Sequence, residues 1–206
     1  MMRFVCFLLL MIAVLSSPVD VQAADFEVTP ILGYTFGGSV KDSETDDSFD
    51  FDDSVSYGVI LGLRDESKKG SAFYEILYSH QPTYLKVDDK ALFDKDHLDV
   101  DINFFHFGGR FGTDGEMVNP YVVAGVGVTY FDVKGGDSET KFSFSIGGGV
   151  NVPLSERISL RFEGRGFGTV LDNDSSVFCV DNQCLVDIDG DVLWQYTGFT
   201  GLVFSF

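Results

Sequence analysis

Apolar and polar residues alternate along most of the chain beyond residue 25, and a period of two is the pattern typical of β-strands. Eight runs show this alternation, separated by stretches rich in Gly, Asp and Ser. They cover residues 26–37, 54–64, 71–81, 97–111, 119–133, 140–152, 157–170 and 191–206. Each run is longer than the roughly 5–6 residues of an ordinary strand and suffices for the about 9–11 residues that a tilted strand needs to cross lipid. The pattern predicts an all-β fold with eight long strands.

The connections between these runs alternate in length. Long connections follow the first, third and seventh runs, at residues 38–53, 82–96 and 171–190, and the fifth run is followed by residues 134–139. Short connections follow the second, fourth and sixth runs, at residues 65–70, 112–118 and 153–156. Barrels that span outer membranes have short periplasmic turns and longer outside loops. The sequence therefore predicts an eight-stranded antiparallel up-and-down transmembrane β-barrel with both ends of its sheet on the periplasmic side.

One face of each run is apolar, and the other carries small, polar and charged residues. In residues 54–64, for example, Val55, Tyr57 and Leu63 alternate with Ser56 and Arg64. A water-soluble barrel would turn its apolar face inward, and the alternation alone does not choose between the two arrangements. Three features favour an outward apolar face: small residues on the polar face, charges of both signs there, and aromatic residues near strand ends. These aromatic residues are Phe26, Tyr34, Phe36, Tyr130, Phe142, Trp194 and Phe204.

The run at residues 97–111 is the least regular, because both of its faces carry apolar residues. One face holds Phe105, Phe107 and Phe111, and the other holds Leu98, Val100, Ile102 and Phe104. If the first face is turned to lipid, residues 97–101 must extend beyond the membrane toward the outside loops. The same assignment turns His106 and Arg110 inward.

The interior of an eight-stranded barrel is just wide enough to be filled by side chains. The polar faces predict that the following side chains point inward: Glu27, Arg64, Glu75, His106, Arg110, Arg161, Glu163, Arg165 and Gln195. A buried charge without a partner costs several kcal/mol, so we expect the carboxylates and guanidinium groups to form a closed network of ion pairs. A continuous conducting pore is the functional alternative.

The first 24 residues have the pattern of a secretory signal. The chain begins MMRF, continues with an apolar run at residues 5–15, and reaches the small residues Ala23 and Ala24. The alternative is an N-terminal membrane anchor, but Pro18 and Asp20 interrupt the apolar stretch. We expect residues 1–24 to be the signal peptide and residues 25–206 to form the barrel domain.

Two cysteines remain beyond the predicted signal, Cys179 and Cys184, within a polar connection. In an exported chain such a pair most simply forms a disulfide. A zinc site is the alternative, but no histidine lies near the pair and zinc requires four ligands. We predict the disulfide.

The formal net charge of −18 excludes nucleic acid as an expected partner, because phosphate contacts require clusters of Lys and Arg. Much of the charge lies in two connections, at residues 41–53 and 171–190. Residues 187–191, DIDGD, partly match a calcium loop but lack its twelve-residue spacing and closing Glu. A solvated acidic run is the simpler interpretation, and we predict no metal and no cofactor.

These features resemble those of the small eight-stranded outer-membrane barrels, which include the opacity proteins and OmpA-type transmembrane domains. The resemblance is clearest in residues 119–131, NPYVVAGVGVTYF, in residues 144–150, FSIGGGV, with residues 154–163, LSERISLRFE, and in the aromatic end of the chain. It implies a location in the outer membrane of a Gram-negative bacterium, in contact with outer-membrane lipid and lipopolysaccharide. The terminal Phe206 is similar to the signal that barrel-assembly machinery recognises.

Such barrels serve adhesion, immune evasion, envelope integrity or lipid chemistry, so the fold alone does not identify the activity. A lipid-modifying enzyme would need a histidine and a nucleophilic serine on the lipid-facing surface. His80 lies beside Ser79, but neighbours in a strand point to opposite faces, and His97 has no evident serine partner. We therefore expect a non-enzymatic barrel that has a structural role or binds an extracellular partner through its acidic loops; a lipid-modifying enzyme and a narrow porin-like channel are the alternatives.

Overall fold

The computed structural model describes residues 26–41, 48–66, 71–86, 97–113, 115, 117–134, 136–171, 176–180, 183–187 and 192–206. Eight long strands build the main sheet: β1 (Phe26–Phe36), β4 (Ser54–Arg64), β5 (Ser71–Lys86), β6 (His97–Gly112), β7 (Asn119–Val133), β8 (Glu139–Pro153), β9 (Ile158–Val170) and β12 (Val192–Ser205). Four short strands form two hairpins, β2 (Ser39–Lys41) with β3 (Ser48–Asp50), and β10 (Ser176–Val180) with β11 (Gln183–Asp187). The predicted signal peptide lies outside the described residues.

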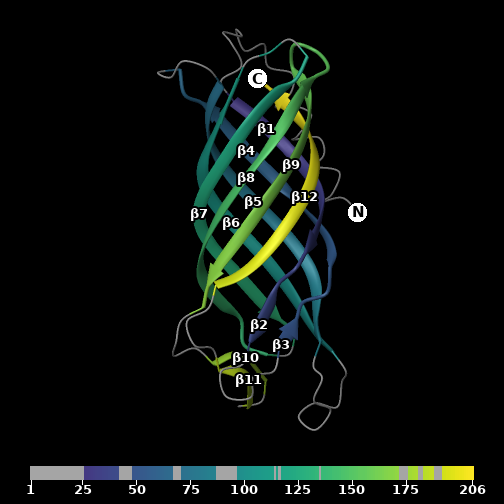
Figure 1. Cartoon of the computed structure of the whole chain (residues 1–206), viewed down its shortest axis with the longest axis vertical. Helices are drawn as coiled ribbons and strands as arrows, with labels where there is room; N and C mark the ends of the chain where they lie inside the picture. The colour runs from purple at the N-terminus through teal and green to yellow at the C-terminus, as the bar shows by residue number, and fades with distance from the viewer. Residues whose placement is uncertain are drawn as a thin grey trace, which may run out of the picture.

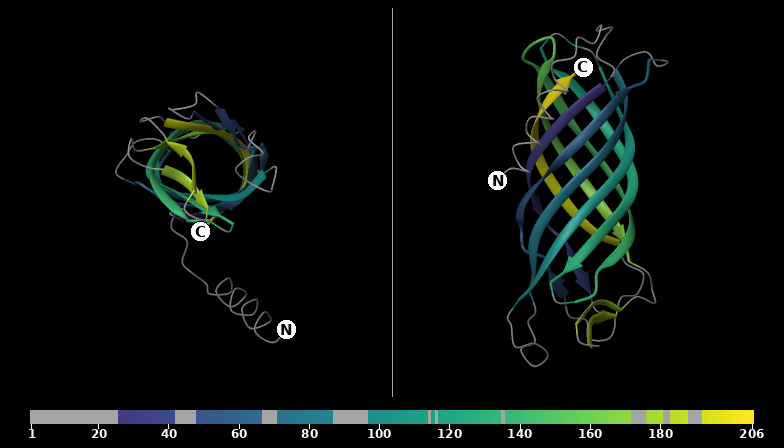
Figure 2. Two further views of the ribbon diagram at one scale, coloured as in Figure 1. Left: turned by 90° about the horizontal axis from the view of Figure 1, so that it is seen from below. Right: turned by 180° about the vertical axis from the view of Figure 1, so that it is seen from behind.

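The eight long strands close into one antiparallel barrel in the order β1-β12-β9-β8-β7-β6-β5-β4. The strands are steeply tilted, and the view along the barrel shows a closed ring (Figures 1 and 2). When only the eight long strands are considered, neighbours in this ring are consecutive along the chain, apart from β1 and β12, which close the barrel. The predicted all-β, eight-stranded up-and-down barrel is confirmed.

The two ends of the barrel differ. We call the end where β1 begins and β12 ends the short-turn end, and the opposite end, which carries both hairpins, the loop end (Figure 1). No helix among the described residues is long and apolar enough to cross a membrane.

The strand boundaries follow the alternation pattern closely, with the largest difference in β5. The pattern predicts an end at residue 81, but β5 continues through Pro82 to Lys86 and pairs with β6 along this whole length. Pro82 lies beyond the last pair of β4 with β5, Tyr57 with His80. A proline is tolerated there because its missing N–H is not needed where one neighbouring strand has ended.

The apolar face of the barrel points outward, as the sequence predicts. All seven predicted aromatic positions near strand ends are exposed on the wall, together with aliphatic residues such as Leu32 and Ile146. The opposite parity points inward: in β12, Leu193, Gln195 and Val203 are buried while Trp194 and Leu202 are exposed. In a membrane this arrangement places apolar side chains against the lipid. The closed sheet also pairs the backbone N–H and C=O groups of neighbouring strands, so the wall has no open edge.

Strands β1 and β12 close the barrel along the whole length of β1. Their register runs from Glu27 opposite Ser205 to Phe36 opposite Tyr196. Beyond it, the N–H of Phe206 donates to the carbonyl of Phe26 at 2.9 Å. The last residues of the sequence therefore complete the hydrogen bonding of the wall.

Candidate functional site

The charged interior is centred on Glu75 and Arg161, which lie on opposite walls. Strand β5 carries Glu75 and β9 carries Arg161, and these strands are four positions apart in the ring of eight. Arg161 Nη1 donates to Glu75 Oε1 at 2.8 Å and Nη2 to Oε2 at 3.2 Å. Both side chains are almost completely buried, with 0% and 3% exposure. This two-bonded contact braces the barrel across its diameter.

Glu163 connects a second group of side chains to this centre. One of its carboxylate oxygens accepts from Arg161 and from the Tyr121 hydroxyl, the latter at 2.8 Å. Its other oxygen accepts from Arg165 Nε at 2.6 Å. Strand β7 supplies Tyr121 and β9 supplies the other three. The network therefore joins three walls of the barrel through buried, charge-assisted bonds.

Arg110 extends the network toward the short-turn end. It contacts Glu27 at 2.6 Å and Glu75 at 3.3 Å, and its guanidinium group lies 4.0 Å from the centroid of the Phe73 ring. Arg64 lies 5.1 Å from the same ring. No ion pair of Arg64 occurs within the part of the chain that the structure describes, so Phe73 is its contact. All seven charged residues predicted to point inward thus face the interior, six of them within ion-pair contacts.

His106 lies beyond the charged side chains, toward the loop end. Its Nδ1 is 2.9 Å from Ser145 Oγ and its Nε2 is 2.8 Å from Ser143 Oγ. In the neutral ring one nitrogen donates and the other accepts, and a hydroxyl can do either. Both ring nitrogens are therefore satisfied inside the wall, and the imidazole is enclosed by Phe104 and Phe167.

The half of the interior nearest the loop end holds a cluster of apolar side chains, beside uncharged polar ones such as Gln81 and Gln195. Phe104 stacks on Phe167 with ring centroids 4.2 Å apart. Further buried apolar residues lie near the loop end, on β6, β7 and β12 and directly after β9: Val100, Ile102, Phe131, Val133, Leu193 and Leu171. The interior is thus filled by two layers: an ionic one toward the short-turn end, and toward the loop end one that we call the apolar layer, in which apolar side chains are combined with uncharged polar ones.

Phe51 completes the apolar layer from the connection that follows β3. Its ring is 4% exposed and stacks on Phe131 at 6.5 Å, while its N–H donates to the Gly38 carbonyl. Gly38 has a φ of 105°, which favours glycine. Phe51 lies with Phe49 in an acidic run that predicts a solvated connection, so the residue pattern does not indicate this role.

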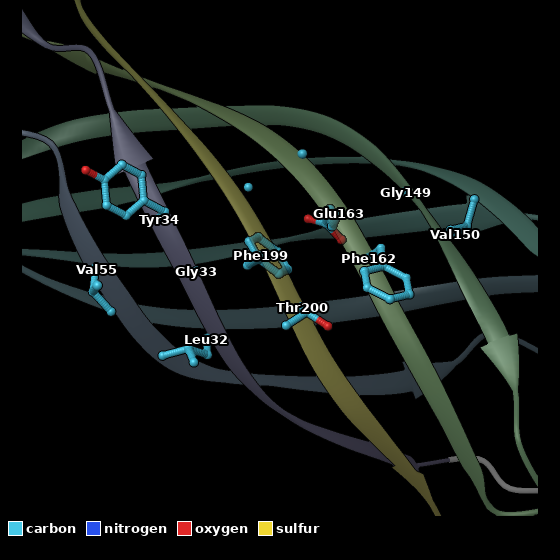
Figure 3. Close-up of a pocket in the computed structure, with 12 residues that line it drawn as sticks. Leu32, Gly33, Tyr34, Val55, Gly149, Val150, Phe162, Glu163, Phe199 and Thr200 are labelled. Atoms are coloured by element: carbon cyan, nitrogen blue, oxygen red, sulfur yellow. The ribbon is translucent and has the colours of Figure 1, made fainter.

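The outer wall contains a shallow hollow across β8, β9, β12 and β1 (Figure 3). Its floor is formed by glycine: a methyl group at Gly164 or Gly198 would meet no atom within 4 Å. Phe162, Val150, Leu32 and Thr200 surround it. The hollow faces outward on the apolar wall, where bilayer lipid would cover it.

A second hollow on the wall lies nearer the loop end, on β5, β6 and β7, and polar side chains form part of its lining. We call it the rim pocket and define it by Tyr78, His80, Asp101, Asn103, Phe105, Val128, Tyr130 and Asp132. His80 belongs to it, whereas His106 is enclosed in the interior. The side chain of His97, at the start of β6, lies outside the described residues.

The two cysteines occupy facing positions of a hairpin. In the register of β10 with β11, Cys179 is opposite Cys184. Their side chains lie outside the described residues, so the predicted disulfide stays a prediction. Among the residues that the structure does describe, no group of three or more His, Cys, Asp or Glu is arranged to hold a metal ion.

The sequence of residues 7–183 matches the family of outer membrane protein β-barrel domains. The chain belongs to this family. Barrels of this family lie in the bacterial outer membrane, so the predicted location is confirmed. Because outer-membrane barrels have short periplasmic turns and longer extracellular loops, we expect the short-turn end to be periplasmic and the loop end to be extracellular.

Solved structures of other outer-membrane barrels share the fold. The barrel is similar to Neisserial surface protein A, with 14% sequence identity over 90% of this chain and 100% of that chain and a TM-score of 0.62. It is also similar to outer membrane protein OprG from Pseudomonas aeruginosa, with 12% identity over 90% of this chain and 97% of that chain and a TM-score of 0.56. No curated protein sequence matches the chain significantly.

Proposed function

We propose that this protein is a non-enzymatic, non-conducting outer-membrane barrel that holds its extracellular segments at the cell surface for contact with a partner. The observation that carries the proposal is the filled interior. An ionic layer around Glu75 and Arg161 and an apolar layer around Phe104 and Phe167 follow one another along the axis. A barrel with a filled interior serves as a membrane anchor for its extracellular segments.

A narrow channel is disfavoured by the same two layers. An ion would have to break the contacts of Arg161, which is fully buried, and then cross a layer of stacked phenylalanine rings. Moving a charge through an apolar region costs many kcal/mol. The two layers therefore support a closed barrel.

A lipid-modifying enzyme is disfavoured by the positions of the histidines. His106 bonds two serines, but all three side chains are buried inside the wall, away from lipid. His80 faces outward, and its hydrogen-bond partner is Asn103 in place of a serine. Nucleophilic catalysis needs a nucleophile within hydrogen-bond reach of its base on the side where the substrate lies.

The acidic extracellular connections supply the proposed binding surface. Residues 41–53 contain seven acids and one lysine. Near the barrel mouth, Asp53 accepts from the N–H of Gly37, and Asp52 leads from Phe51 into β4. A surface of this charge is complementary to a basic partner, and its attraction weakens as salt is added.

Planar-bilayer recording of the purified protein tests the closed state. We expect no steady conductance from the wild type and stepwise conductance from a doubly opened variant, Arg161→Ala with Phe104→Ala. Heat-modifiable gel migration confirms that the variant is folded. Steady channels from the wild type would refute the closed barrel.

Binding by intact cells tests the display role. Cells producing the wild type are compared with cells producing a variant in which the acids of residues 42–53 are replaced by their amides. We expect the variant to lose salt-sensitive adhesion while surface levels stay equal. Equal adhesion of both strains at low salt would refute a role for these acids, and lipid A changed by expression of the wild type would refute the non-enzymatic assignment.

A further inference from the structure

A third hollow lies at the loop-end rim of the barrel, where β1 leads into the hairpin of β2 and β3 beside β12. We call it the aromatic hollow, and its lining includes Gly37, Gly38, Asp53, Trp194 and Tyr196. Its volume of about 530 Å³ is in the range of small-ligand sites. Its exposed rings and carboxylate belong to neither of the two layers that fill the interior.

The ring of Tyr196 lies against the wall because glycine is present on two sides of it. Tyr196 is opposite Gly166 of β9, and a methyl group at Gly166 would lie 3.4 Å from Cδ1 and Cε1 of the ring. A methyl group at Gly37 would lie 3.6 Å from Cδ2, on the other edge of the ring. Both edges of the ring therefore rest on backbone, and one face of this half-exposed residue is turned outward.

Trp194 and Phe36 extend this face into a platform. The Trp194 ring is nearly parallel to that of Tyr196, with an interplanar angle of 13° and centroids 6.4 Å apart. Phe36, opposite Tyr196 on β1, lies at 26° with centroids 6.3 Å apart. From β8, Phe144 packs edge-on against Trp194 at 5.3 Å. The rings hold one another in place and present an aromatic surface at the rim.

Asp53 places a negative charge beside this platform. Its Oδ1 accepts from the N–H of Gly37 at 3.3 Å, which holds the carboxylate at the turn after β1. Within the part of the chain that the structure describes, Asp53 makes no other hydrogen bond and no ion pair, so Oδ2 is left without a partner there. A cation in the hollow would therefore meet a carboxylate oxygen and the face of an aromatic ring at the same time.

We propose that the aromatic hollow binds an arginine side chain of a basic partner protein, an assignment that rests on the proposed display function. The planar guanidinium group stacks on the outward faces of Trp194 and Tyr196, and its N–H groups donate to Asp53 Oδ2. Lysine fits less well because its ammonium is a strongly hydrated point charge without a flat face. A sugar ring would also stack on the platform, but the seven acids and one lysine of residues 41–53 favour a basic partner.

Peptide binding to the full barrel tests this assignment. The protein is purified in an uncharged polyoxyethylene detergent, which has no sugar headgroup. It is titrated at about 0.1 M salt, where charges more than about 10 Å apart are largely screened, with a blocked peptide of alternating arginine and glycine or with its lysine counterpart. Trp194 is the only tryptophan of the sequence, so the change in its fluorescence reports occupancy of the hollow. We expect the arginine peptide to bind about fivefold more tightly, as expected for one cation–π contact at an exposed site.

Two single changes locate the contact. Asp53→Asn and Tyr196→Leu should each weaken binding of the arginine peptide by about threefold to fivefold, and Tyr196→Leu should also remove the preference over lysine. Asp137→Asn and Tyr130→Leu are the matched controls, because they remove one exposed charge and one exposed ring at the same end of the barrel. Both controls should change the affinity by less than about twofold, since they lie away from the hollow. Heat-modifiable gel migration confirms that each variant is folded.

Three outcomes would overturn this proposal alone. Equal affinity for the two peptides would show that only net charge is recognised. Losses in Asp53→Asn and Tyr196→Leu no larger than in their controls would place binding elsewhere on the barrel. Displacement of the arginine peptide by maltotriose would show a saccharide site instead. Binding of neither peptide, even at lower salt, would overturn the proposed display of an acidic surface to a basic partner as well.

Discussion

Replacing Glu75 by glutamine should destabilise the barrel more than any other isosteric change of a single carboxylate among the described residues. Glu75 lies within 3.5 Å of the guanidinium groups of Arg110, Arg161 and Arg165, and it is 3% exposed. Glu75→Gln keeps the shape of the side chain and removes its charge. Three buried cations then share the remaining carboxylates, Glu27 and Glu163.

The magnitude follows from the cost of an unpaired buried charge. Removing one partner of a buried ion pair costs about 3–5 kcal/mol. The value for Glu75→Gln should fall in this range, because Glu163 still neutralises part of the charge on Arg161 and Arg165. With a urea dependence of about 2 kcal/mol per molar, the unfolding midpoint should fall by about 2 M.

Urea unfolding of the barrel in detergent micelles, followed by heat-modifiable gel migration, measures this change. Glu156→Gln, in the exposed turn between β8 and β9, is the matched control and should change stability by less than about 0.5 kcal/mol. Combining Glu75→Gln with Arg161→Met should cost less than the sum of the two single changes, because they remove both partners of one contact. A midpoint for Glu75→Gln within error of the wild type would refute the view that this network stabilises the barrel.

Three further outcomes can be checked with the same unfolding assay or with thiol chemistry. His106→Leu leaves the buried hydroxyls of Ser143 and Ser145 without their partner and should cost about 1–3 kcal/mol; adding Ser143→Ala and Ser145→Ala should recover part of it, and no recovery would contradict this cause. Gly38→Ala should destabilise by more than about 1 kcal/mol because its φ is 105°, whereas Gly164→Ala, with open space beside it, should be neutral. Cys179 and Cys184 of the exported protein should resist alkylation until a reductant is added; free thiols before reduction would exclude the predicted disulfide.

The alternation of side chains was sufficient to predict the strands of this barrel and the direction of their faces. It works because a strand with lipid on one side and a packed interior on the other must repeat every two residues. The prediction ended β5 at residue 81 because Pro82 reads as a breaker, and only the position of β4 shows that its missing N–H is harmless there.

The interior shows where sequence reasoning stops. Arg161 and Glu163 can be placed on one face from their spacing, but Glu75 is 86 residues away, and nothing in the sequence selects it as the partner. Val100, Ile102 and Phe104 appeared as exceptions to the pattern, although they are regular inward positions in an apolar layer. The pattern used to assign the faces expects polar residues inside the barrel, so it does not predict an apolar layer there. The apolar side chains of this layer come from strands that lie far apart in the sequence, and they meet only when the sheet curves and closes.

The contacts that cross the barrel can form only late in folding. Glu75 with Arg161, Glu27 with Arg110 and Gln81 with Gln195 each join strands that are not neighbours in the ring. A sheet that is still open holds these partners apart, so the contacts form only as β12 meets β1. Interactions absent from the transition state slow unfolding without speeding folding. The barrel should therefore be difficult to reopen once it has closed, and its lifetime in the membrane should depend more on these internal braces than on the speed of its insertion.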